Sequence, residues 1–166
     1  SEKSGERHGL WTWWYENGIK KIEIPFNVGK EDGILTFWND KGIKEGGKLY
    51  KYGNLKTQWY YYENGQMSGK DEINDGQKDG LSTYWYENGK VKSESIWEND
   101  TQTGLYISYF DNGNKYQEGI INNGKQNGEW RLWKENGQNH VIRSYNNGEI
   151  VNEWTYYYKN YDNGTK

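Results

Sequence analysis

Short stretches in which aromatic or β-branched residues alternate with polar residues recur along the whole chain. The clearest example is 80–86, Gly-Leu-Ser-Thr-Tyr-Trp-Tyr, which is followed by Asn88-Gly89 and a more polar stretch, 90–97. Alternation with a period of two, together with this choice of residues, predicts two β-strands. Asn-Gly between them predicts a tight type I′ turn, because both residues tolerate a positive φ. The unit is therefore predicted to be a β-hairpin.

This hairpin unit recurs at an almost fixed interval of about 24 residues, and such a period is typical of stacked supersecondary units. The aligned turn glycines are Gly18, Gly42, Gly65, Gly89, Gly113, Gly137 and Gly164. We therefore predict an all-β fold, a repeat array of about seven ~24-residue β-hairpins that form an elongated, twisted antiparallel meander. The predicted single domain is 1–166, with repeats at approximately 9–32, 33–55, 56–79, 80–103, 104–127 and 128–151, and with 152–166 as an incomplete cap.

Alternation also gives each first strand two faces. The neighbours Tyr84 and Trp85 point to opposite sides, and we call these the Tyr84 face and the Trp85 face. The Trp85 face keeps nearly one pattern in every repeat, so we predict that it is the packed face. An apolar residue eight positions after each turn glycine, such as Trp97, is predicted to join it. On the Tyr84 face aromatic residues are plentiful but their pattern varies, as on a ligand-facing or half-exposed surface.

The composition supports a folded array. Leu, Ile, Val and Phe total only 26 of 166 residues, which alone is typical of disorder. However, the net charge is only −3, and 10 Trp and 16 Tyr supply large apolar surfaces at regular positions. The absence of Cys excludes disulfides and thiolate chemistry. No window approaches 18 apolar residues, so no transmembrane segment is predicted.

The repeats resemble the variant MORN repeat (membrane occupation and recognition nexus). The shared features are an opening Gly, an aromatic-rich strand, an Asn-Gly turn, a return strand with Lys and Glu, and a closing Gly-x-x-x-Gly. Residues 80–100 and 104–124 match best, and the resemblance extends over 5–164. In bacteria such arrays resemble a family labelled as antitoxins, which implies protein binding without catalysis. Eukaryotic MORN arrays are associated with membranes and phosphoinositides, but the negative net charge and interspersed Lys and Glu of this chain depart from that use.

The chain begins inside a repeat, because residues 4–9 match 123–128. We therefore expect that a targeting segment was removed, or that the chain was trimmed, before Ser1. The predicted compartment stays open between the bacterial cytoplasm and, if a signal segment preceded Ser1, the periplasm or cell surface.

No catalytic residue, metal site or cofactor is predicted. The acidic residues before Asn-Gly form a column that suits Ca²⁺ or a basic partner, but solvated turns explain them better. They are Glu16, Glu63, Glu87, Asp111, Glu135 and Asp162. His8 and His140 lie at different points of the repeat and are interpreted as surface residues. Nucleic-acid binding is not expected, because 21 Lys and Arg against 24 Asp and Glu do not supply a basic groove.

Aromatic residues of the Tyr84 face are the predicted partner-binding site, because Tyr and Trp are enriched at protein interfaces. If the strands pair in sequence order, a contiguous patch forms over the third to fifth repeats. Its members are Tyr60, Tyr62, Tyr84, Tyr86, Tyr106 and Phe110. The alternative interpretation is that cross-strand Tyr ladders simply stabilise the sheet.

The predicted function is that of a non-catalytic repeat scaffold that binds a partner protein, in an immunity or antitoxin-like role. One alternative is a carbohydrate-binding or adhesin-like surface protein, since sugars stack on exposed rings. Membrane-lipid association is a further alternative. The identity of the partner and the binding face are left open by the sequence.

Overall fold

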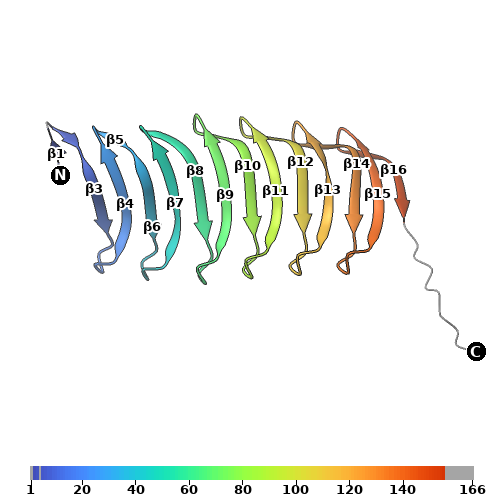
Figure 1. Ribbon diagram of the computed structural model, residues 1–166, viewed down its shortest axis with the longest axis horizontal. Coiled ribbons are helices and arrows are strands. Elements are labelled where there is room, and N and C mark those ends of the chain that lie inside the picture. Colours follow the sequence, from blue (N-terminus) through green and yellow to red (C-terminus); the bar gives the residue numbers. More distant parts are fainter. Residues whose placement is uncertain (1, 4, 156–166) are drawn as a thin grey trace, which may run out of the picture.

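The computed structural model in Figure 1 describes residues 2–3 and 5–155. Two short strands, β1 (Glu2–Lys3) and β2 (Glu6–Arg7), pair with each other. The main sheet has 14 strands. They are β3 (Gly9–Trp14), β4 (Lys20–Asn27), β5 (Lys30–Glu31), β6 (Gly33–Trp38), β7 (Lys44–Lys51), β8 (Asn54–Tyr61), β9 (Met67–Asn74), β10 (Gln77–Trp85), β11 (Val91–Glu98), β12 (Thr101–Tyr109), β13 (Lys115–Asn122), β14 (Lys125–Trp133), β15 (Asn139–Asn146) and β16 (Glu149–Thr155).

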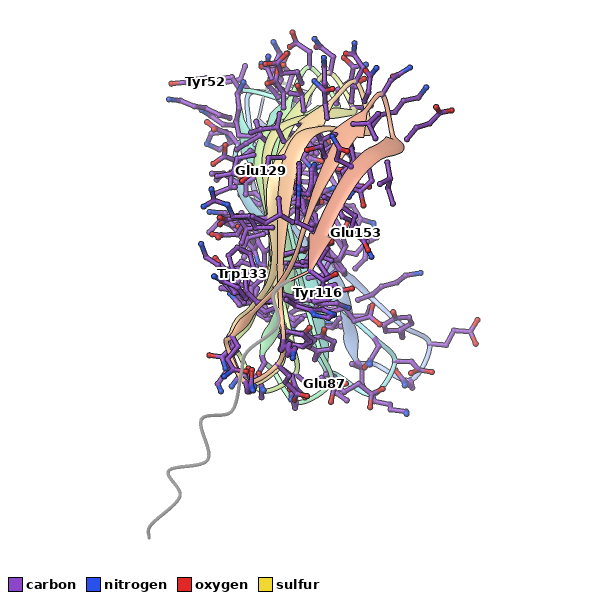
Figure 2. The ribbon with its side chains drawn as sticks, turned by 90° about the vertical axis from the view of Figure 1, so that its right-hand side faces the viewer. Tyr52, Glu87, Tyr116, Glu129, Trp133 and Glu153 are labelled. Carbon is purple, nitrogen blue, oxygen red and sulfur yellow. The ribbon has the colours of Figure 1, made fainter. Side chains whose placement is uncertain are left out.

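Strands that are consecutive in sequence are neighbours in this sheet, from β3 at one end to β16 at the other, and short β5 pairs with β4. All pairings are antiparallel. In Figure 2 the sheet is a single layer with side chains on both sides. The predicted all-β hairpin meander is thus confirmed. Most of the predicted cap at 152–166 lies outside the described residues.

The turns at the two ends of the hairpins differ. In the loop after β3, only Gly18 has a positive φ, of 81°. The Gly18 N–H donates to the Tyr15 carbonyl at 3.0 Å, and the Tyr15 N–H donates to the Ile19 carbonyl at 2.8 Å. These bonds describe a three-residue loop, in which a type I turn is followed by a left-handed glycine. The type I′ turn predicted at this Asn-Gly is therefore wrong.

Type I′ turns do occur, at the opposite end of the hairpins. Between β9 and β10, Asp75 and Gly76 have φ values of 48° and 83°. The same two-residue turn recurs between the other repeats, where the first residue is usually Asn or Asp and the second is usually Gly. Figure 2 places Tyr52, from a type I′ turn, at one end of the sheet and Glu87, from a three-residue loop, at the other.

Side chains in the three-residue loops join each repeat to the next one. Asn88 Oδ1 accepts the Lys90 N–H at 3.0 Å, while Asn88 Nδ2 donates to the Asp111 carbonyl at 2.7 Å. Asn17, Asn64 and Asn112 make the equivalent bonds to the carbonyls of Asp40, Glu87 and Glu135. The Asn of the Glu-Asn-Gly motif therefore both closes its own turn and holds the next repeat at a fixed distance.

Aromatic rings replace a second layer of structure by lying over glycines of the same sheet. Any Cβ at Gly119 would clash with the ring of Trp130, which is only 1% exposed. Trp130 forms the main apolar cluster with Ile121, Leu132 and Val141. Such ring-on-glycine pairs are a way for neighbouring strands to bury apolar area without an opposing layer.

This cluster shows that the predicted packed face is wrong. Register pairs place Trp130, Leu132 and Val141 on the Tyr84 face, together with buried Ser82. On the Trp85 face, aliphatic residues such as Leu10 and Leu105 are exposed. The apolar column of the return strands also lies on the Tyr84 face, because Phe26 pairs with Gly9 and Ile121 with Gly104. In Figure 2, Trp133 and Glu129 stand on the Trp85 side, and Tyr116 and Glu153 on the other.

The first type I′ turn is predicted to be strained, and Val28→Asn is expected to relieve it. Val28 is a β-branched residue with a φ of 48°, and it is 65% exposed, so little packing is lost by replacing it. Because the left-handed conformation costs L-residues about 1–2 kcal/mol, and Asn less, Val28→Asn should raise the free energy of unfolding by about 1 kcal/mol in urea melts. The reverse change, Asn123→Val at a φ of 49°, should lower it by a similar amount. Equal stability of both variants and the parent chain would contradict this account.

Candidate functional site

A row of apolar residues crosses the first repeats on the Tyr84 face. Each member is the register partner of the next, from β3 to β10. In order, the row is Trp13, Ile22, Phe37, Gly46, Tyr60, Gly69 and Tyr84. The pairing thus brings residues from four repeats into one line perpendicular to the strands. We call this line the aromatic row.

The two glycines let the rings of the aromatic row cover the backbone between them. A Cβ at Gly46 would lie 2.6 Å from Phe37 Cζ, and one at Gly69 would lie 3.0 Å from two ring carbons of Tyr84. Phe37 also contacts Tyr60 edge to face, with ring centroids 6.3 Å apart. Tyr60 is 39% exposed and Trp13 37%. The row is therefore a low, partly exposed apolar surface.

A shallow depression lies at the end of the aromatic row nearest β3. It has a volume of about 310 Å³ and is lined by Trp13, Lys21, Ile22 and Ile24. A Trp and two Ile beside a Lys offer an apolar floor with one cationic edge. Such a depression suits a side chain that has an apolar body and a polar or anionic tip.

Only two of the six predicted site residues belong to the aromatic row, Tyr60 and Tyr84. Tyr62 and Tyr86 lie near the three-residue loops, where their hydroxyls donate to the carbonyls of Trp85 and Tyr109 at 2.7 Å. These bonds join residues 23 positions apart in sequence and so connect successive repeats. Burial raises the pKa of Tyr86, and nearby Asp111 raises it further, so its hydroxyl stays a donor.

The other two predicted residues lie farther along the sheet. Tyr106 stacks on Trp130 at 5.8 Å, and Phe110 packs edge to face on Tyr116 at 5.0 Å. Ser82 and Ser95 separate Tyr106 from Tyr84. The six residues therefore do not lie in one register line, although the Tyr86 hydroxyl is within electrostatic reach of those of Tyr62 and Tyr106.

Sequence reasoning missed Trp13, Ile22 and Phe37 as members of the site. The signal was present for the two rings, since both lie five residues before a turn glycine, as Tyr60 and Tyr84 do. For Ile22 the signal was absent, because its place in the row depends on the register of β4 against β6.

Next to Tyr84, a buried carboxylate organises a polar cluster. Asp71 is only 3% exposed. Its Oδ1 accepts the Ser82 hydroxyl at 2.6 Å and the Tyr84 hydroxyl at 3.0 Å, and lies 3.0 Å from Lys78 Nζ. Its Oδ2 accepts Gln58 Nε2 at 3.2 Å. The Lys78 ammonium also donates to the Tyr84 hydroxyl at 2.8 Å.

The cluster keeps Asp71 ionised. Burial on its own would raise the pKa of this carboxyl, but the hydrogen bonds from Ser82, Lys78 and Gln58 outweigh it, so the pKa is below its ordinary value. For Lys78, burial opposes the charge, whereas the bonds to Tyr84 and Asp71 raise its pKa. The ion pair thus fixes the position of the Tyr84 ring at the end of the aromatic row.

In the part of the chain that the structure describes, no group of three His, Cys, Asp or Glu side chains is arranged to hold a metal ion. Nor does that part contain a helix long and apolar enough to span a membrane.

Asp71→Asn is expected to lower the free energy of unfolding by about 2–4 kcal/mol, because it leaves Lys78 half-buried without its counter-ion. The pKa of Asp71 is lower in the native state than in the unfolded state. The wild type should therefore have its full extra free energy of unfolding over Asp71→Asn above the unfolded pKa of about 4, and this difference should decline as the pH falls through the native pKa. Denaturant melts from pH 7 down to pH 2 should therefore show the two proteins converging in acid.

Two buried serines provide a matched control on the same face. Ser82→Ala removes a bond to Asp71 and should cost about 1–2 kcal/mol. Ser108 is also buried, but its Oγ has no hydrogen-bond partner among the described residues, so Ser108→Ala should cost less than about 0.5 kcal/mol. Equal costs for the two changes would show that the bond to Asp71 is not the source of stability.

Comparison with known proteins agrees with the repeat architecture. The family model described as MORN repeat variant matches residues 7–27, 78–99 and 102–123. The first segment contains β3 and β4, and the other two contain β11 and β13 together with all but the first residue of β10 and β12. A search of curated proteins finds no match.

Among solved structures, one similar chain belongs to the Glycosylation Associate Protein (Gap123) complex from Streptococcus agalactiae, at 13% identity and a TM-score of 0.41. The similarity covers 62% of this chain and 19% of that chain, so this chain matches only a small part of its length. The three segments matched by the family model carry the same hairpin that the rest of the sheet repeats, and in these segments the chain is similar to the MORN repeat variant family.

Proposed function

We propose that this chain is a non-catalytic scaffold that binds a partner protein through the aromatic row of the Tyr84 face. The observation that carries the proposal is the continuity of the row, since Trp13, Phe37, Tyr60 and Tyr84 come from four repeats and lie in one register line. Exposed Trp and Tyr are the residues that most often dominate binding energy at protein interfaces.

The surroundings of the row fit a protein ligand. Lys21 borders the depression beside Trp13, and Lys78 stands beside Tyr84 at the other end of the row. The site is thus an apolar strip with a cation, Lys21, near one end, while the Lys78 charge at the other end is already paired with Asp71. A segment with apolar side chains and an acidic residue beside Trp13 would complement it. At about 4.8 Å between neighbouring strands, the seven strands of the row span about 29 Å, enough for an extended segment of about nine residues.

Absence of catalysis is part of the proposal, and the Asp71 cluster supports it. Ser82 lies beside a carboxylate and a lysine but is only 1% exposed. Its hydroxyl donates to Asp71 at 2.6 Å, so it is already engaged. A nucleophile needs substrate access and an unengaged base, so this cluster suits positioning of Tyr84 better than chemistry.

The finer part of the proposal is an immunity or antitoxin-like role. It rests on the likeness of the repeats to bacterial arrays that carry the antitoxin label. In that role the aromatic row would cover a surface that the partner needs for its own activity.

Carbohydrate binding is the second candidate, and one observation favours it. Phe37 and Tyr84 each extend over a glycine rather than standing upright, and Tyr60 lies between them. Rings that lie low on a sheet offer faces on which the apolar face of a sugar can stack. Free sugar should compete with carbohydrate binding but not with the binding of a partner protein.

The double variant Trp13→Ala/Tyr60→Ala is expected to lose partner binding. The measurement is affinity capture from the source cell's lysate and envelope, followed by titration of the identified partner. Removing two of the four rings of the row should weaken binding at least tenfold, as for interface hot spots. Trp14→Ala/Tyr61→Ala is the matched control, because these neighbours are also a Trp and a Tyr but point to the Trp85 face.

Unfolding curves must show that both double variants remain folded. Capture of one protein by the wild type and by the control, and its loss with Trp13→Ala/Tyr60→Ala, supports the proposal. Equal loss in both double variants would reject the aromatic row as the site. Elution by free sugar without a captured protein would move the function to carbohydrate binding.

A further inference from the structure

A band of exposed aliphatic residues runs along the Trp85 face, near the type I′ turns. Each of four repeats contributes one cross-strand pair to it. The pairs are Leu10 with Pro25, Ile34 with Leu49, Leu81 with Ile96, and Leu105 with Ile120. Six of the eight residues are 38% to 59% exposed, and Pro25 and Ile96 are half-buried. We call these eight residues the aliphatic band.

The repeats between the first and fifth contain one break in the aliphatic band. In the third repeat its positions are taken by Thr57 and Glu72, which pair with each other on β8 and β9. From the first repeat to the fifth, the cross-strand pairs at this level of the sheet are thus two apolar pairs, one polar pair and two apolar pairs. A row of exposed aliphatic groups of this length is unusual on a monomeric protein and marks an interaction surface.

We propose that a second copy of this chain covers the aliphatic band, in a two-fold dimer whose axis runs parallel to the strands between β8 and β9. Rotation about this axis reverses the order of the strands and keeps the band over the band. It places Leu10 over Ile120, Pro25 over Leu105, Ile34 over Ile96, Leu49 over Leu81 and Thr57 over Glu72 of the second copy. Every apolar position then meets an apolar one, and the Thr57 hydroxyl meets the Glu72 carboxylate.

The next row of the Trp85 face, toward the three-residue loops, is also complementary under this rotation. Thr12 pairs with Glu23, Thr36 with Gly47, Trp59 with Lys70, Thr83 with Glu94, and Ile107 with Glu118. The rotation sets Thr12 over Glu118, Thr36 over Glu94, Trp59 over Lys70, Gly47 over Thr83 and Glu23 over Ile107 of the second copy. No carboxylate faces another carboxylate and the lysine faces an indole, while Glu23, which meets Ile107, keeps its own ion pair with Lys20.

The area is sufficient for a stable dimer. Ten strands at about 4.8 Å, each covered over about six residues at 3.4 Å, give about 1,000 Å² per copy. A standard protein interface buries about 800 Å² per partner. Twisted sheets pack face to face at about −30°, with alternate side chains filling the space between them. The Tyr84 face of each copy stays outside, so the dimer goes beyond the proposed function without competing with it.

The first test is sedimentation velocity of the full chain over a concentration series. We expect a monomer–dimer equilibrium that Ile34→Glu weakens at least tenfold, because it buries a charge against Ile96 of the second copy. Tyr60→Glu is the control, since Tyr60 is similarly exposed on the other face and should leave the equilibrium unchanged. A wild-type chain that stays monomeric well above micromolar concentration, or an Ile34→Glu dimer as tight as wild type, would overturn the proposal.

The second test addresses the register. Ile96→Lys alone should also weaken the dimer, but an equimolar mixture of Ile34→Glu and Ile96→Lys should recover to within about threefold of wild type. In the mixed dimer the new Glu faces the new Lys, and the second contact is the native Ile34 over Ile96. Failure of the mixture to recover would reject the strand-parallel axis between β8 and β9. Sedimentation of monomeric wild type with phosphatidylglycerol vesicles would assign the aliphatic band to a lipid surface instead.

Loss of dimerisation and loss of partner capture are separate outcomes. Trp13→Ala/Tyr60→Ala should still form dimers, and Ile34→Glu should still capture the partner as a monomer. A variant that loses both properties while folded would show that the two faces are coupled, and would overturn the assignment of the band to the second copy alone.

Discussion

The lack of an opposing layer is the constraint on which this structure depends. A sheet in a sandwich buries one face against another sheet, whereas this sheet has side chains and solvent on both sides. Apolar area must then be buried within one face. Trp130 over Gly119 and Tyr84 over Gly69 achieve this, because a glycine on one strand leaves room for a ring from the next. The high content of Trp, Tyr and Gly and the scarcity of Leu and Val follow from the same need.

Hydrogen bonds at the two ends of the hairpins supply the second requirement, a fixed spacing between repeats. Asn88 and Tyr86 both donate to carbonyls of the next repeat, 23 residues on, and Gly124 N–H donates to the Gln102 carbonyl at the opposite end. A change in loop length would break these bonds on both sides. This explains why the interval between turn glycines stays at 23 or 24 residues wherever the structure describes both repeats. Stability is thus nearly local, one interface at a time.

The sequence was sufficient for the fold class because alternation, Asn-Gly and a constant period all favour stacked hairpins. It was insufficient for the faces, since a period of two separates two sides without saying which one is packed. Uniformity predicts that the Trp85 face is packed, but this uniformity reflects exposed Leu and Ile, while the varied Tyr84 face contains Trp130, Ser82 and Asp71 in different repeats. The turn type was misplaced because Asn-Gly occurs at both ends, and loop length decides which residues take a positive φ.

The candidate site was only half predictable for a related reason. Tyr60 and Tyr84 share a repeat position with Trp13 and Phe37, which a column of aligned repeats can show. By contrast, Tyr62 and Tyr86 belong to a column whose hydroxyls bind backbone carbonyls. Position in the repeat therefore distinguishes the rings that hold the array together from the rings that remain available to bind a partner.

Two accessible faces with different chemistry follow from a one-layer sheet. The Tyr84 face has rings lying over glycines and a buried polar cluster, and the Trp85 face has a band of exposed aliphatic side chains beside Trp59, whose ring lies over Gly47. Rings that lie low suit a ligand that adapts to a rigid surface, whereas exposed Leu and Ile side chains interdigitate with a matching set. In the proposed dimer, the pair of Trp85 faces becomes the core that a single layer lacks. The two aromatic rows then point in opposite directions, so that one dimer presents two identical sites. A partner with two binding segments gains avidity from both sites only if the linker between its segments reaches around the edge of the sheets.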